Sequence, residues 1–311
     1  MSWEFGYQEV ASGDTATFDF SGDVALALYG ISRFDITFDI DATVIGLVGS
    51  SISGFGVQLT RENAGEDSRR QVKVKATVTG TPITASRVGV TVLAWVGGAS
   101  STRFIVSSSG LATGEMSQPQ SVVAWPAFAS AVLTGFKLAY TSGSHDVSGV
   151  GASAGVAASI TTPGAAYVTG AATLTGDGAS GCTVDPSGLV LADAEEGAWF
   201  GLVSDEAQYE VDDTNWGTRR LRVETGAPVP LKGAVVLLQS FFGRFKATAS
   251  EPVPVYSVSM GAGVPVLSAE NGVFEFDSTR WLTNIYIDTA VGKTYYDPAQ
   301  TYSAVYLWAA L

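Results

Sequence analysis

The chain has 311 residues, of which 46% are hydrophobic and 15% charged, and its formal net charge is -13 at pH 7. This composition excludes a disordered chain, which needs few apolar residues and many charges. The 36 glycines follow no Gly-X-Y period, which excludes collagen. Because an acidic surface repels phosphate groups, we expect neither nucleic acid nor an anionic membrane surface as a partner.

The opening residues, MSWEFGYQEV, lack the basic and apolar regions of a secretory signal. No apolar run approaches the roughly 18 residues that a membrane-spanning helix needs. Cys182 is the single cysteine, so an intrachain disulfide and a cysteine metal site are both excluded. We therefore expect synthesis in a host cytoplasm, no membrane insertion, and a location in the virion, which carries proteins out of a cell without secretion.

Along the chain, short runs alternate apolar and polar residues. Phe34, Ile36 and Phe38 alternate with polar neighbours, and the segment 71–80 alternates in the same way. This period of two is typical of strands with one face on a core and one in solvent. No stretch combines a helical period with capping residues. Turn residues separate the runs, so the chain is predicted to form antiparallel β-sandwiches.

Three segments of the chain resemble one another, at 26–54, 131–157 and 237–264. Each has an aromatic-centred alternation, around Phe34, Phe136 and Phe245 respectively, followed by a turn and a Val/Ser/Gly strand. Recurrence of the same landmarks at one period is typical of tandem repeats.

The three copies also share their ends, because strand-like runs around Trp95, Trp199 and Trp308 close them at nearly equal spacing. We predict an all-β chain of three tandem antiparallel β-sandwich modules, at 1–99, 100–206 and 207–311. A single large sandwich with accidental internal similarity is the alternative.

The module resembles the H-type lectin-like β-sandwich. The segments 92–96 and 305–309 match that family's closing strand, V-x-V-x-W-I-A, and 135–140 with His145 is similar to the GFxLxY…H stretch of related domains in tailed-phage virion proteins. The family's sugar-binding arrangement of Asp, Arg and aromatic residues is not evident in any copy. The resemblance implies three-fold association, hence a homotrimer. The closing tryptophans Trp95, Trp199 and Trp308 would then line the seam between subunits.

No constellation of catalytic residues stands out, so no catalytic residue, cofactor or metal ligand is expected. His145 stands beside Ser144 and Asp146, but neighbouring residues point apart, so these three residues predict a polar turn rather than a triad. The acidic clusters lack the spacing of a calcium-binding loop and are expected in solvated loops. These clusters are Asp193/Glu195/Glu196, Asp205/Glu206 and Glu210/Asp212/Asp213.

Two loop tryptophans have polar neighbours of the kind that carbohydrate sites use. The candidate ligand-binding residues are Asp213, Asn215, Trp216, Asp277, Arg280 and Trp281. Alternatively, each tryptophan fills a domain or subunit interface.

The first hypothesis is a virion structural protein of a tailed phage or phage-like particle. It would be a trimeric external appendage, a tail-tip fibre or a head spike, held to other virion proteins and used for rigid display and host adhesion. The second hypothesis is a lectin that binds a host cell-surface glycan. The third is a depolymerase of envelope polysaccharide, which would need two carboxylates held about 5–10 Å apart.

Overall fold

A computed structural model describes most of the chain, and every regular element in the described part is a β-strand. The described residues are 1–38, 54–63, 69–80, 83–122, 125–139, 147–158, 164–176, 180–195, 197–208, 217–245, 255–289, 292–296 and 299–311. Within these ranges there is no helix of the length and hydropathy that crossing a membrane requires. The all-β prediction is confirmed.

The strands fall into three consecutive groups, which we call units 1, 2 and 3. Unit 1 contains β1 (Ser2–Ala11), β2 (Thr15–Asp19), β3 (Val24–Phe38), β4 (Gly54–Arg61), β5 (Gln71–Gly80) and β6 (Ile83–Val96). Unit 2 contains β7 (Arg103–Ser107), β8 (Leu111–Ala112), β9 (Gln120–Ser121), β10 (Phe128–Ala139), β11 (Val147–Ala158), β12 (Ala165–Gly176) and β13 (Thr183–Leu191). Unit 3 contains β14 (Trp199–Gln208), β15 (Gly217–Glu224), β16 (Ala234–Phe245), β17 (Val255–Ala262), β18 (Val266–Leu267), β19 (Val273–Thr289), β20 (Gly292–Tyr296) and β21 (Ala299–Ala310).

Three antiparallel sheets share one strand order, and each sheet joins two units. Sheet A runs β1-β6-β3-β17-β19-β15, sheet B runs β7-β13-β10-β4-β5-β2, and sheet C runs β14-β21-β16-β11-β12-β9. The short strands β18 and β20 pair with β19 in sheet A, and β8 pairs with β13 in sheet B. Along each of these orders, three strands of one unit continue into three strands of another through a single pair, β3–β17, β10–β4 or β16–β11. The units are therefore interlocked around an approximate three-fold arrangement.

Each unit is still a sandwich, because its two three-stranded layers lie in different sheets and face one another. In unit 2, for example, β10 and β13 contact β11 and β12 across the layer gap. In unit 1, alternation puts Phe34 and Ile36 into the interior while Arg33 and Asp35 stay about one-third exposed, as the sequence predicted. The interiors merge into one large apolar core.

The boundary predicted between the second and third modules falls inside β14. This strand begins at Trp199 and pairs along its whole length with β21, so it is the first strand of unit 3. Unit 2 closes on β13, which ends at Leu191. The prediction that Trp199 closes a copy is therefore wrong. A tryptophan on a strand shows that the strand is partly buried, but not which strand it pairs with.

The three units meet at a triangle of phenylalanines, Phe34, Phe136 and Phe241. Their ring centroids are 5.1, 5.3 and 5.0 Å apart. In each unit a β-bulge lies just before the phenylalanine, on β3, β10 and β16. The equivalent residue in unit 3 is therefore Phe241 and not Phe245, which the sequence pattern had suggested.

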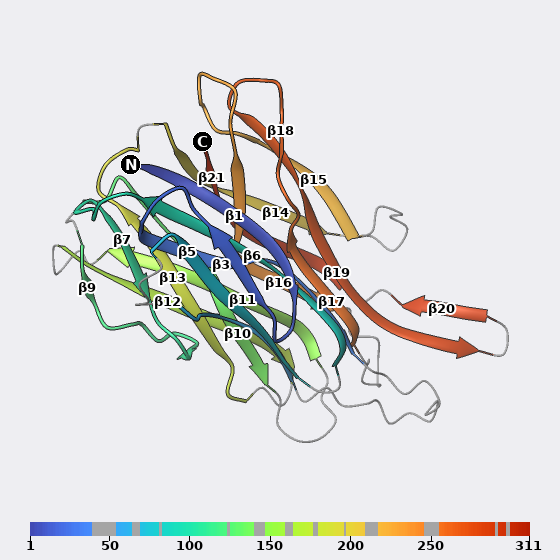
Figure 1. The fold of residues 1–311 in the computed structure, drawn as a ribbon. Coiled ribbons are helices and arrows are strands. Elements are labelled where there is room, and N and C mark those ends of the chain that lie inside the picture. The colour runs from blue at the N-terminus through green and yellow to red at the C-terminus, as the bar shows by residue number, and fades with distance from the viewer. Residues whose placement is uncertain are drawn as a thin grey trace.

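A second, smaller core lies on the opposite face of the sheets, at the end of the molecule that holds both chain termini (Figure 1). We call it the termini-end core. All three units contribute to it, for example through Leu93 of unit 1, Leu189 of unit 2 and Leu307 of unit 3. The molecule is thus closed around its three-fold arrangement by apolar packing on both faces of the sheets.

Candidate functional site

The described surface carries a polar cluster where sheet A passes from unit 1 to unit 3. Arg33 and Asp35 lie on β3, and the Nε of Arg33 is 2.9 Å from Oδ2 of Asp35. Across the junction, the hydroxyl of Ser259 on β17 donates a hydrogen bond to Asp35. Both charged side chains are about one-third exposed, at 31% and 32%. This junction cluster is therefore fixed by its own bonds and still reachable from solvent.

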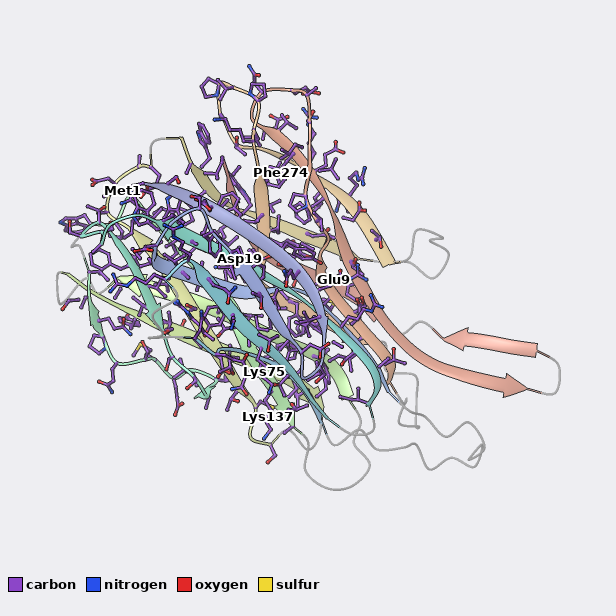
Figure 2. All side chains as sticks on the ribbon, viewed as in Figure 1. Met1, Glu9, Asp19, Lys75, Lys137 and Phe274 are labelled. Atoms are coloured by element: carbon purple, nitrogen blue, oxygen red, sulfur yellow. The ribbon has the colours of Figure 1, made fainter. Side chains whose placement is uncertain are left out.

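The aromatic ring of Tyr7 borders the junction cluster. Tyr7 lies on β1, and Gly89 beside it lies on β6, the strand between β1 and β3. Tyr7 lies over Gly89, where a Cβ added to the glycine would come within 3.0 Å of the tyrosine Oη and 3.4 Å of the Cβ of Arg33. The Tyr7 hydroxyl donates to Oε1 of Glu9 at 2.7 Å, and Glu9 marks this region in Figure 2. Glycine at position 89 leaves the space that the Tyr7 ring occupies beside Arg33.

The electrostatics of the cluster favour binding over catalysis. Burial, together with the hydrogen bond to Glu9, raises the pKa of Tyr7, so its phenol remains protonated and acts as a donor. A nucleophilic serine needs a neighbouring base that can take its proton, whereas the carboxylate beside Ser259 is already paired with the Arg33 guanidinium. The arrangement therefore offers an aromatic face, donors and acceptors to a polar ligand, without an activated nucleophile.

The three unit junctions are alike in backbone but differ in these side chains. At the positions of Arg33 and Asp35, the β10–β4 junction has Gly135 and Lys137. The β16–β11 junction has Ser240 and Phe242 there. The polar cluster is thus particular to the junction of units 1 and 3, which makes it a candidate for a specific role rather than a requirement of the fold.

Only part of the predicted ligand-binding set falls in the described structure. Asp277 lies on β19 and forms an exposed ion pair with Arg220, with Oδ1 and Nε 3.0 Å apart. Arg280 and Trp281 lie on the same strand, where Trp281 pairs with Ser259 of the junction cluster; their side chains lie outside the described part. Asp213, Asn215, Trp216 and His145 lie outside the described residues. The backbone thus brings one predicted position next to the cluster.

The predicted seam tryptophans do not share one location. Trp95 lies in the termini-end core, 5.4 Å from the ring of Trp3 and under the guanidinium of Arg103 from unit 2. Trp308 packs in the large core against Phe274, and Trp199 is partly buried at the same core. Trp95 and Trp308 are only 7% and 8% exposed, so most of their surface is already covered within one chain.

Two of the acidic residues expected in solvated loops are buried, which corrects that prediction for these two, whereas Asp193 and Glu206 are exposed. The Asp205 side chain is fully buried on β14, and the Glu195 side chain is 5% exposed and bound to Arg103. Hydrogen-bond partners make this burial tolerable, and sequence spacing does not show them. In the described ranges, no three His, Cys, Asp or Glu residues lie close enough together to hold a metal ion.

The sequence pattern indicated only a solvent face beside Phe34, and it gave no site role to Arg33, Asp35, Tyr7 or Ser259. Alternation around Phe34 placed Arg33 and Asp35 on one face, which was a usable signal. Nothing local places β17 beside β3, because Asp35 and Ser259 are 224 positions apart in sequence. A search against protein-family models and a search of curated proteins both found no match to this chain.

Proposed function

We propose that the chain is a structural protein of a tailed phage or phage-like particle, forming a rigid external appendage for display and host adhesion. The observation that carries the proposal is the interlocking of three sandwiches through three shared sheets. A body in which every sheet crosses a unit boundary resists bending between units, which suits a tail-tip fibre or a head spike. The resemblance to H-type lectin-like virion domains supports the same role.

The homotrimer is a separate part of the proposal. The resemblance implies that single domains associate three-fold, and here one chain already places three sandwich units around a shared phenylalanine triangle. Light scattering of the purified chain decides between the two states. A mass of three chains supports a homotrimeric spike, and a mass of one chain means that the internal arrangement takes its place.

Electron microscopy tests the role in the particle. Particles made with and without the protein are compared, with an antibody against the chain to mark its position. The proposal predicts an external projection that disappears with the protein and returns when the protein is supplied. Identical particles, or a label found only inside the shell, would contradict it.

A second candidate function, carbohydrate binding, is favoured by the junction cluster. Arg33, Asp35 and Ser259 combine with the nearby Tyr7 ring to offer polar groups and an aromatic face of the kind that saccharide sites use. It would give the appendage a means of host adhesion.

Glycan binding tests this candidate with variants at both proposed positions. Asp35→Asn should abolish binding if the junction cluster is the binding site. Trp216→Ala should abolish binding if the site is instead the loop predicted from the sequence. Lys137→Gln, at the equivalent position of another junction, is the matched control and should bind normally. Absence of binding to any host surface glycan would refute the candidate.

A further inference from the structure

A buried polar network lies in the sandwich of unit 3, away from the junction cluster. Oδ2 of Asp205 on β14 accepts a hydrogen bond from the Ser278 hydroxyl on β19 at 2.6 Å. The Ser278 oxygen is 2.8 Å from the hydroxyl of Tyr306 on β21, and Arg219 on β15 donates to Oδ1 of Asp205 at 3.3 Å. Asp205, Ser278 and Tyr306 are all fully buried. The network therefore joins the two layers of this sandwich, since β14 and β21 belong to sheet C and β15 and β19 to sheet A.

The other two units have no such network at the positions of Asp205, Ser278 and Tyr306. Positions are matched by their pairing relative to Phe34, Phe136 and Phe241. Unit 1 has Val10, Ala76 and Val90 where unit 3 has Asp205, Ser278 and Tyr306, and unit 2 has Leu111, Gly170 and Pro186. The fold thus accepts an apolar layer at this level twice in the same chain.

The apolar layers of units 1 and 2 argue against a role in stability alone for the network of unit 3. Burying a carboxylate carries a desolvation cost that its partners offset only in part, and replacing a buried ionic group by apolar residues is often neutral or stabilising. Polar groups that must find each other can instead specify which elements associate. In this chain that selection matters, because three similar layers of each kind compete for stacking partners.

We propose that the network is a pairing lock, which specifies that the layer β14-β21-β16 stacks on the layer β15-β19-β17. If β14-β21-β16 stacked on the equivalent layer of unit 1, Asp205 would face Ala76 and lose both Ser278 and Arg219. Burying a carboxylate without these partners is costly, so the wrong stacking is disfavoured. One such lock restricts the other two pairings as well, because each sheet joins two units.

The test is a triple variant, Asp205→Val, Ser278→Ala and Tyr306→Phe, refolded from denaturant and compared with the unmodified chain. We expect its denaturation midpoint to equal or exceed that of the unmodified chain. We expect its recovery in the native species, measured by size-exclusion chromatography with light scattering, to fall at least about twofold in favour of mispaired or intermolecularly exchanged forms.

The matched control removes another buried polar pair, in which the bulge position is polar in every unit and the partner position holds Thr91, Ser187 and Leu307. Ser32 and Thr91 are hydrogen-bonded through their hydroxyls beside the bulge of unit 1, and the residues equivalent to Ser32 are the polar Thr134 and Gln239. Ser32→Ala with Thr91→Val should leave the recovery unchanged. Unchanged recovery of the triple variant would overturn the proposal. A lowered midpoint would also overturn it, because the network would then be an ordinary stabilising contact.

Discussion

Two neighbouring layers of the three-fold arrangement are filled in different ways. In the phenylalanine triangle, all three units supply the same side chain, and the three ring distances differ by only a few tenths of an ångström. Four residues earlier on the same strands, the units supply Gly30, Val132 and Leu237. A Cβ added to Gly30 would lie 3.0 Å from both the Val132 and the Leu237 side chains.

The difference between the two layers shows which contacts keep the residues of the three units identical. In the triangle each ring touches both others, so each position has the same requirement. In the Gly30 layer only the summed volume is constrained, because close packing fills a space without specifying which chain segment fills it. Three units can therefore keep one architecture while their sequences diverge at most positions.

The largest expected effect is the loss of one corner of the triangle. Phe136→Ala removes a ring that contacts Phe34, Phe241 and Phe55, and the free energy of unfolding should fall by about 3–5 kcal/mol. Chemical denaturation measures this loss. Phe104→Ala, at a partly buried ring outside the triangle, should cost clearly less. Equal losses would mean that the triangle is no more important than any other apolar contact.

The second largest loss of unfolding free energy is expected at the buried ion pair of the termini-end core. Arg103 has its guanidinium carbon 3.5 Å from the ring centroid of Trp95 and its Nη2 2.5 Å from Oε2 of Glu195. Arg103→Ala would remove this cation from beside the buried Glu195 carboxylate. The carboxylate would keep the hydrogen bond from the neutral Nε1 of Trp3, at 3.2 Å. We expect a loss of about 3 kcal/mol in unfolding free energy, because an uncompensated buried charge remains.

A second variant distinguishes charge from packing at this position. Adding Glu195→Gln to Arg103→Ala removes the uncompensated charge and should recover a measurable part of the lost unfolding free energy. No recovery would attribute the whole effect to the stacking of Arg103 on Trp95.

How far the sequence could lead depended on the range of the interaction. Alternation around Phe34 gave the strand and its buried face, because that pattern is local. The equivalence of Phe241 could not be inferred, since several phenylalanines stand close together there and only the pairing with β11 and β21 selects one. For the same reason the exchange of layers between units, and Ser259 of the junction cluster, had no local signal.

A smaller effect is expected in the Gly30 layer, where volume can be redistributed. Gly30→Val would overpack the layer against Val132 and Leu237 and should lower the unfolding free energy by about 1–3 kcal/mol. Combining it with Val132→Gly moves the same side chain from one unit to another. If only summed volume matters, this double variant should be more stable than Gly30→Val alone. A simple sum of the two separate losses would refute the argument drawn from this layer.

The smallest effect on stability is expected at the exposed edge of sheet A, which is polar, whereas the phenylalanine triangle and the Gly30 layer are apolar and buried. Arg222 on β15 donates to Glu270 with Nη2 and Oε2 2.5 Å apart, and this bond lowers the pKa of the Glu270 carboxyl below its ordinary value. A lowered pKa favours the folded state above the ordinary pKa, and that contribution is lost as the pH falls through the pKa of the folded protein. Arg222→Gln should raise the pKa of Glu270 towards its ordinary value, as measured by NMR titration.

The denaturation midpoint of Arg222→Gln at neutral pH should stay unchanged, because water screens exposed pairs. A midpoint shift comparable to that of Gly30→Val would mean that edge contacts contribute to stability on the same scale as the three-fold packing.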